Sequence, residues 1–279
     1  MGKVLEVQGL SKLYGQGCAH CLECTGPEFE TNLCPHCGSI VAANNVSFDL
    51  YAGEILGIMG ESGSGKSTVV KFINFDETPS AGRATFYQQN DSPDEWPLFD
   101  MNRAQQRYLA SRNFGMVYQN PHLGLNFDIS AGGNIAERLL VSGKPHYGYI
   151  RKRAIHLLSR TEVLPARMDE LPRNFSGGMQ QRVQIAKALA TKPPLLLLDE
   201  VTTGLDLSVQ AAILDLILEI QQQSHTAMIV VTHDLGVIRL LADRTLVMKY
   251  GHVIESGLTD QILEDPQQPY TQRLVASAL

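Results

Sequence analysis

Short apolar segments recur along this chain, separated by turn residues or by longer amphipathic segments. Their length and alternation predict β-strands. The strands expected in the first half are Val4–Leu10, Val46–Leu50, Glu54–Met59, Arg83–Gln88 and Phe114–Tyr118. Turns at Ala52–Gly53 and Pro79–Gly82 divide them. A helix is expected to begin near Lys66, and residues 89–100 are expected to form a polar loop.

The second half has a different pattern. From Ser130 to about Ala190 the periodicity is helical, with breaks at Pro145, Pro165 and Pro172. Strands and helices then alternate through Leu195–Leu198, Asp206–Gln222, Ala227–Val231, Asp234–Ala242 and Thr245–Lys249. Such alternation predicts an α/β protein with a parallel sheet covered on both faces. Residues 120–190 are expected to form an inserted helical subdomain.

Composition limits the class of protein. Of the 279 residues, 44% are hydrophobic and 19% charged, which is ordinary for a globular protein. No apolar run approaches the roughly 18 residues of a membrane span, and the start, Met-Gly-Lys-Val-Leu-Glu, has no secretory h-region. We therefore expect a cytoplasmic protein that meets a membrane, if at all, through another subunit. The net charge of −6 argues against nucleic acid as the main partner.

The segment Gly60-Glu-Ser-Gly-Ser-Gly-Lys-Ser-Thr68 fits the phosphate-loop pattern and lies between a predicted strand and a predicted helix. Its glycines let backbone N–H groups approach phosphate oxygens. Lys66 should reach the β- and γ-phosphates of ATP, and the Ser67 hydroxyl should hold Mg²⁺. The residues predicted to bind ATP here are Gly60, Glu61, Ser62, Gly63, Ser64, Gly65, Lys66, Ser67 and Thr68.

Two further motifs flank the strand predicted at Leu195–Leu198. One lies at its end and the other lies upstream of it. Asp199 and Glu200 follow four leucines, and two acids at the tip of a buried strand are costly unless metal or water chemistry uses them. The ordinary alternative is a solvated acidic turn. Upstream, Phe175-Ser-Gly-Gly-Met-Gln-Gln-Arg182 places a serine and two glycines at a helix start, where N–H groups and the helix dipole attract anions.

This combination resembles the signature motif of ABC-type ATPases. The resemblance implies an ABC ATP-binding domain over residues 1–279, with a parallel core sheet, an antiparallel β edge and the helical subdomain. In that family the signature contacts ATP held by a second domain, so a homodimer or a pair with a related ATPase is implied. The signature residues here are Ser176, Gly177, Gly178 and Gln180, and the aspartate of the domain interface is Asp206. One departure is Val201, where the family usually has a proline without a catalytic group.

The resemblance also assigns roles. The catalytic residues it implies are Glu200 as general base, His233 as the contact to the γ-phosphate, and Lys66. The Mg²⁺ ligands it implies are Ser67, Gln119 and Asp199, and Tyr14 is the aromatic residue stacked on adenine. Taken alone, a histidine at a strand end, a loop glutamine and a tyrosine near a terminus each have an ordinary structural explanation.

All five cysteines fall within the insert of residues 16–40. Cys18-Ala-His-Cys21 and Cys34-Pro-His-Cys37 form two C-x-x-C pairs, the spacing of a Cys₄ zinc ribbon. Cys24 is left over. An empty site and an iron–sulfur cluster are the alternatives, although the spacing typical of a cluster is incomplete. The insert lies close to Tyr14, so a docking role for it is one hypothesis.

The segments between the motifs narrow the kind of ABC ATPase. They resemble the K subunits of carbon–phosphorus lyase systems at Ser130–Arg138, His146–Gly148, Phe175–Arg182, Thr232–Gly236, Leu240–Arg244, Leu246–Lys249, Val253–Asp260 and Pro269–Thr271. This implies an ATPase docked on lyase-core subunits that break the carbon–phosphorus bond of phosphonates. The alternative is the ATPase of a dipeptide or oligopeptide importer, whose members usually extend further after the Pro-Tyr-Thr segment. A DNA-repair ATPase is a third, disfavoured by the net charge.

Overall fold

The computed structural model describes residues 2–88 and 94–277. The chain divides into two compact units: Met1–Arg103 with Ala227–Leu279, and Ala104–Thr226. Among the helices of the described residues, none has both the length and the apolar character needed to cross a bilayer.

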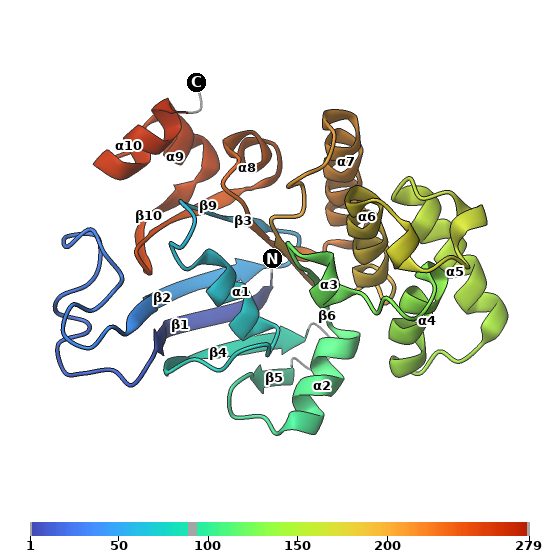
Figure 1. Ribbon diagram of the computed structural model, residues 1–279, viewed down its shortest axis with the longest axis horizontal. Helices are drawn as coiled ribbons and strands as arrows, with labels where there is room; N and C mark the ends of the chain where they lie inside the picture. The colour runs from blue at the N-terminus through green and yellow to red at the C-terminus, as the bar shows by residue number, and fades with distance from the viewer. Residues whose placement is uncertain (1, 89–93, 278–279) are drawn as a thin grey trace. The chain divides into compact units, whose positions relative to one another are not determined.

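The first unit contains an antiparallel sheet in the order β2-β1-β4-β5 (Figure 1). Its strands are β1 (Lys3–Tyr14), β2 (Ile40–Tyr51), β4 (Ala81–Gln88) and β5 (Asp94–Pro97). Leu5, Leu10, Leu50 and Phe86 are fully buried on one face, as alternation along the strands requires. This sheet is the antiparallel β edge expected from the sequence.

The strand β5 corrects the expectation of a loop over residues 89–100. Asp94–Pro97 pairs antiparallel with β4, and Trp96 lies opposite Phe86. Three of its four residues are polar or proline, so it carries no apolar pattern, and only the pairing with β4 makes it a strand. Residues 89–93 of the predicted loop lie outside the described residues.

The same unit also contains parallel strands. β3 (Ile55–Met59) pairs with β8 (Ala227–Val231) on one side and with β9 (Arg244–Lys249) on the other, both parallel. Every residue of β3 and β8 is buried, which is typical of strands covered on both faces. The strand β10 (His252–Leu258) adds to β9 antiparallel.

Helices of the first unit pack on these strands. They are α1 (Lys66–Ile73), α8 (Leu235–Leu241), α9 (Thr259–Glu264) and α10 (Pro269–Ala276). Met59 at the end of β3 belongs to one buried cluster with Ile238, Val247, Ile262 and Tyr270. The C-terminal helices therefore share a core with the strand that leads into the phosphate loop.

The second unit is mainly helical around two parallel strands, β6 (Phe114–Val117) and β7 (Leu195–Asp199). Its helices are α2 (Arg103–Arg112), α3 (Pro121–Gly124), α4 (Ala131–Val141), α5 (Tyr147–Arg160), α6 (Gly177–Ala188) and α7 (Leu207–Ser224). Short 3₁₀ turns begin at Pro165 and Pro172, so these prolines interrupt the helical pattern as predicted. Ser130 and Ser176 cap α4 and α6 by accepting hydrogen bonds from backbone N–H groups.

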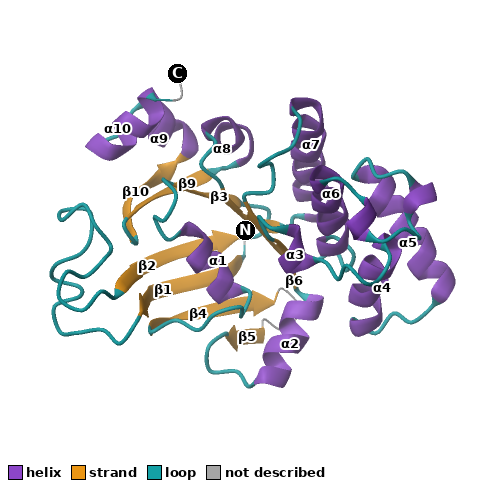
Figure 2. Cartoon of the chain, viewed as in Figure 1, coloured by secondary structure: helices purple, strands orange, loops and turns teal. Residues whose placement is uncertain are grey.

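The cysteine-rich insert lies between the end of β1 and the start of β2. Figure 2 draws the described residues 15–39 as loop. Isolated bridges join Gly26 to Thr31 and Leu33 to Ile40. Among the insert's residues the buried side chains are Cys21, Thr25, Cys34 and Ser39, so two thiols make up much of its small interior.

Candidate functional site

The phosphate loop connects the end of β3 to the start of α1, as predicted. Lys66 is only 4% exposed. Its Nζ donates hydrogen bonds to the carbonyls of Gly60 at 2.8 Å and Glu61 at 2.7 Å. A phosphate would offer this ammonium a charged acceptor in place of neutral ones, and charge-assisted hydrogen bonds are the stronger kind. The loop therefore holds its lysine where an anion can engage it.

Contacts from three other segments hold the loop backbone. The Glu61 N–H donates to the Tyr270 hydroxyl at 3.0 Å, and the Gly251 N–H donates to the Ser64 carbonyl at 3.0 Å. The Asn32 Nδ2 donates to the Gly63 carbonyl at 3.3 Å. No sequence motif pointed to Asn32, and Tyr270 belonged to a segment that carried the family resemblance but was assigned no role of its own.

His233 and Tyr14 both lie in the first unit. Val231 pairs with Ile58 of β3, so the exposed His233, two residues further along, leaves the sheet at the phosphate-loop edge. The Tyr14 hydroxyl donates to Glu77. Burial and this carboxylate raise the pKa of Tyr14 to about 12, against a hydrogen bond with Thr68 that lowers it. The phenol is therefore neutral near pH 7, and it lies beside the first turn of α1.

The second unit brings Gln119 and Glu200 together. They follow β6 and β7, whose parallel pairing sets Val117 beside Leu198. The Gln119 Nε2 donates to Glu200 Oε2 at 2.6 Å. Glu200 has a φ of +49°, a left-handed conformation that is uncommon for a residue with a side chain. Backbone strain of this kind is often found at functional sites.

Two buried glutamines of α6, which the sequence analysis missed, fix the residue before Gln119. The Tyr118 N–H donates to Gln184 Oε1 at 2.6 Å, and the Tyr118 carbonyl accepts from Gln184 Nε2 at 3.0 Å and Gln181 Nε2 at 3.2 Å. Both glutamines are less than 5% exposed. The sequence did contain one indication of their role. Both glutamines stand among the apolar residues of α6, such as Val183 and Ile185, that are buried.

The predicted signature residues stand at the N-terminus of α6. The Ser176 Oγ accepts from the Met179 N–H at 3.3 Å, and Gly177 is exposed. The Gln180 amide instead turns back and donates to the carbonyls of Pro172 at 3.0 Å and Phe175 at 3.1 Å. Gln180 therefore shapes the loop that presents the serine. Asp206 is exposed at the start of α7 and forms no side-chain cap hydrogen bond there.

The predicted magnesium ligands have suitable chemistry in each unit. Mg²⁺ prefers oxygen donors such as hydroxyl and carboxylate groups. Ser67 offers a hydroxyl in the first turn of α1. In the second unit Asp199 offers a carboxylate that is 4% exposed at the end of β7. The Gln119 amide nitrogen faces Glu200, so its oxygen is left to face another partner.

The family model described as "ABC transporter" matches residues 43–203, more than half of the chain. The chain belongs to this family. It is an ABC-type ATPase, and the matched residues include the phosphate loop, the signature and the acidic pair. They do not include the cysteine insert. The sequence resemblance to ABC ATPases and the expected fold class are thereby confirmed.

Individual relatives agree. The chain is 52% identical over 236 residues to PhnK of Escherichia coli (strain K12), a protein named for phosphonates utilization and ATP binding. The aligned region covers 85% of this chain and 91% of PhnK. It is 38% identical to the oligopeptide transport ATP-binding protein OppD of Bacillus subtilis (strain 168), over 86% of this chain and 67% of OppD. A dimeric structure of the ATP-binding cassette MJ0796 bound to ADP and Pi is 28% identical, with a TM-score of 0.77 over 91% of this chain and 98% of the cassette.

The four thiols of the two C-x-x-C pairs converge in the insert. The sulfurs of Cys18, Cys21, Cys34 and Cys37 all lie within 4.8 Å of one another. The sulfur–sulfur distances are 3.7 Å for Cys18–Cys21, 3.7 Å for Cys18–Cys34 and 3.4 Å for Cys21–Cys37. A tetrahedral zinc ion with Zn–S bonds of about 2.3 Å places its sulfurs about 3.8 Å apart. The thiols therefore fit such an ion.

The surroundings of these sulfurs also suit a metal. Burial would raise the pKa of Cys34, but the backbone N–H groups of His36 and Cys37 bring it to about 6. The Cys18 N–H donates to the Cys21 sulfur at 3.2 Å. Cys24 lies beside the set, with its sulfur 3.6 Å from that of Cys34 and 2.9 Å from the His20 carbonyl.

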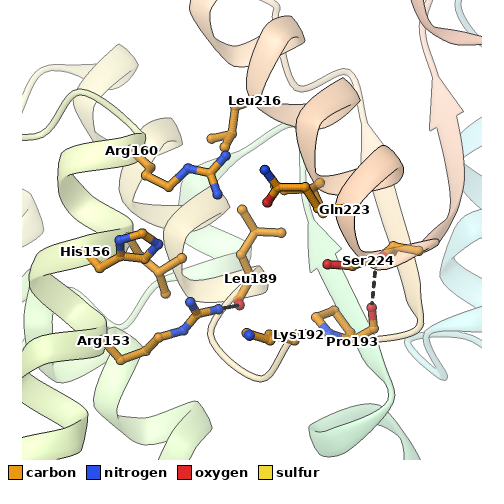
Figure 3. A pocket seen from close by; sticks show the side chains of 12 residues that line it. Arg153, His156, Arg160, Leu189, Lys192, Pro193, Leu216, Gln223 and Ser224 are labelled. Atoms are coloured by element: carbon orange, nitrogen blue, oxygen red, sulfur yellow. Dashed lines mark hydrogen bonds between the residues drawn. The ribbon is translucent and has the colours of Figure 1, made fainter.

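A separate cavity of about 140 Å³ lies in the second unit, and none of the residues that line it is predicted to bind ATP (Figure 3). Arg153, His156, Arg160 and Lys192 line it. Arg153 donates to the Leu189 carbonyl at 2.8 Å and so caps the C-terminus of α6, and Arg160 pairs with Glu219. Two of its cations thus have structural partners.

Proposed function

We propose that this chain is the ATP-hydrolysing subunit that docks on a carbon–phosphorus lyase complex and drives its conformational cycle in phosphonate catabolism. One observation carries the proposal: the 52% identity to PhnK extends over 85% of this chain and 91% of PhnK. Importer ATPases such as OppD match a similar share of this chain at 38%. The bond-breaking chemistry would belong to other subunits of that complex.

The geometry within each unit supports the hydrolytic roles that we propose. In the first, Lys66 and the loop N–H groups bind the phosphates of ATP, His233 contacts the γ-phosphate, and Tyr14 stacks on adenine. In the second, Glu200 accepts a proton from the attacking water while the Gln119 amide orients its carboxylate. Ser67, Gln119 and Asp199 are the residues that would hold Mg²⁺, which neutralises charge on the phosphates when bound.

A second ABC domain completes the active unit. Two solved structures of the similar cassette MJ0796 are dimeric. Here the N-terminus of α6 is exposed at Gly177, and Asp206 is exposed next to Leu207, which is 84% exposed. An exposed leucine beside these polar groups suits a face covered by a partner. Ser176, Gly177 and Gly178 would bind the ATP held by that partner through N–H groups at the helix start.

The insert contributes a structural Zn²⁺ held by Cys18, Cys21, Cys34 and Cys37. The sulfur separations of 3.4 to 3.7 Å support this assignment. Metal analysis of the purified chain should give one zinc per chain. The double variant Cys34→Ser/Cys37→Ser should lose it and, if the insert docks the complex, weaken assembly. Iron in place of zinc, or no metal, would refute the zinc assignment.

The test of the proposed function is affinity purification. The tagged native protein is recovered from cells that are starved of phosphate and fed a phosphonate, and the co-purifying proteins are identified. Lyase-core subunits are the expected companions. Integral membrane permeases would instead make this chain the motor of a dipeptide or oligopeptide importer and would refute the lyase proposal.

A further inference from the structure

The cysteine insert contacts the phosphate loop directly. The Asn32 Nδ2 donates to the Gly63 carbonyl at 3.3 Å, although the two residues are 31 positions apart. Gly63 is part of the loop that binds ATP phosphates, and Asn32 is not part of any nucleotide-binding motif. The cysteine insert thus holds a peptide group of the phosphate loop.

The backbone ties Asn32 to the thiol cluster. Its carbonyl accepts from the Val41 N–H at 2.8 Å, and the Cys34 N–H donates to the Ser39 carbonyl at 2.8 Å. These two hydrogen bonds form a small ladder that places Asn32 two residues from Cys34, one of the four converging thiols. The position of the Asn32 amide therefore depends on the fold of the second C-x-x-C pair.

The other strand of this ladder also meets the phosphate loop. Val41 leads to Ala42, and a Cβ built on Gly65 would lie 2.1 Å from the Ala42 carbonyl oxygen. Gly65 directly precedes α1, so β2 packs against the loop at the very start of the helix. The insert and its return strand touch the loop at two separate points.

A hydrogen bond to the Gly63 carbonyl has a defined effect on the loop. A trans peptide group is planar, so the Gly63 carbonyl and the Ser64 N–H point in opposite directions. Holding the carbonyl therefore restrains the direction of the Ser64 N–H, which also donates to the Glu61 carbonyl at 3.2 Å within the loop. Phosphate loops bind anions through N–H groups arranged in advance, and a peptide that is free to rotate would lose part of this arrangement.

The insert has little else to keep it folded. Its residues 15–39 form no helix or strand, and its small core cluster consists of Cys21, Cys34 and Val41, with Leu13, Cys18 and Cys24 packed against it. A segment of this length with so small a hydrophobic core usually needs a cross-link or a metal to be ordered. Loss of the metal should therefore release Asn32.

We infer that metal bound by the four cysteines sets the affinity of the phosphate loop for ATP, through the hydrogen bond from Asn32 to Gly63. The inference rests on the metal site proposed above. Asn32 is a positioning residue, because it acts on the loop and not on the nucleotide. The insert then supports the phosphate loop only while it holds its metal, so nucleotide binding depends on that metal.

The experiment measures the dissociation constant of a fluorescent ATP analogue, mant-ATP, for the full chain with and without its metal. Asn32→Ala should keep its zinc and its melting temperature but bind mant-ATP about three- to tenfold more weakly, the usual effect of one hydrogen bond. Removal of zinc from the wild type with a chelator, followed by return to magnesium buffer, should weaken binding by a similar factor. In Asn32→Ala, zinc removal should cost little more.

The matched control is Tyr270→Phe, which removes a hydrogen bond to the same loop from outside the insert. It should bind mant-ATP more weakly, yet lose affinity on zinc removal as the wild type does, because its hydrogen bond reaches the loop from α10 and not from the insert. The inference is overturned if Asn32→Ala with full zinc binds mant-ATP like the wild type, or if the metal-free wild type does. If the purified chain never contains metal, both the zinc assignment and this inference are refuted. If the chain contains zinc but its affinity for mant-ATP does not change on zinc removal, only this inference is refuted.

Discussion

The Gln119 amide nitrogen lies 2.6 Å from a carboxylate oxygen of Glu200, although the two residues are 81 positions apart in the chain. Parallel pairing of β6 with β7 brings them to one edge. The amide donates to an oxygen that a general base would use to accept a proton from water. A proposed magnesium ligand and the proposed general base are thus joined by a direct hydrogen bond.

The proposed role of Glu200 gives the first prediction. In Glu200→Gln the side chain keeps its size but cannot accept a proton, so phosphate release should fall at least about 100-fold. ATP binding should persist, and gel filtration with ATP should show a trapped dimer. Glu219→Gln, on α7 in the same unit, is the control. Hydrolysis by Glu200→Gln at the wild-type rate would show that another group acts as base.

Gln184 should matter for both stability and turnover. It accepts from the Tyr118 N–H and donates to the Tyr118 carbonyl, and it is 1% exposed. Gln184→Met keeps the length but removes the acceptor of the Tyr118 N–H and one of the two glutamine donors to its carbonyl, which should cost about 1–3 kcal/mol of unfolding free energy in urea. Turnover should also fall, since Tyr118 positions Gln119.

Gln222→Met, on the exposed side of α7, is the matched control for that substitution and should change neither quantity. If Gln184→Met is as stable and as active as this control, the hydrogen bonds between Gln184 and the Tyr118 backbone contribute neither to stability nor to turnover.

Much of this site could be predicted from sequence because its chemistry is local. The phosphate loop, the acidic pair and the signature are contiguous motifs whose residue types follow from what backbone N–H groups, carboxylates and lysine can do. Gln181 and Gln184 escaped prediction because their meaning lies in a contact with Tyr118, far away along the chain. Asn32 escaped for the same reason, since one polar residue in a loop has no pattern. The strand Asp94–Pro97 depends wholly on its neighbour β4.

Two glycines of the phosphate loop should differ sharply in their tolerance of alanine. Both have positive φ, +80° at Gly63 and +102° at Gly65, which costs an L-residue about 1–2 kcal/mol. At Gly63 a Cβ would meet no described atom within 4 Å, whereas at Gly65 it would lie 2.1 Å from the Ala42 carbonyl oxygen. Gly65→Ala should therefore lose about 1–3 kcal/mol more unfolding free energy than Gly63→Ala.

Urea unfolding of the two alanine variants decides this point, and mant-ATP binding adds a second readout. Gly65→Ala should bind no nucleotide, because the loop must move to make room for the new Cβ. Equal stability of the two variants would mean that the close approach to β2 is easily relieved.

The cationic cavity of the second unit predicts a dependence of stability on pH. Burial lowers the pKa of His156, and the charges of Arg153, Arg160 and Lys192 lower it further, while Glu219 raises it. The unfolded chain then takes up this proton at a higher pH than the folded chain does. Stability should therefore decline as the pH falls through the unfolded value near 6.5.

His156→Gln should remove this contribution, so that its unfolding free energy falls less between pH 7.5 and 5.5 (about one unit either side of that value). His225→Asn, at the exposed end of α7 in the same unit, is the matched control, and the comparison of the two slopes isolates His156. If both variants lose stability in parallel with the wild type, the cations around the cavity do not act on His156 in the folded protein.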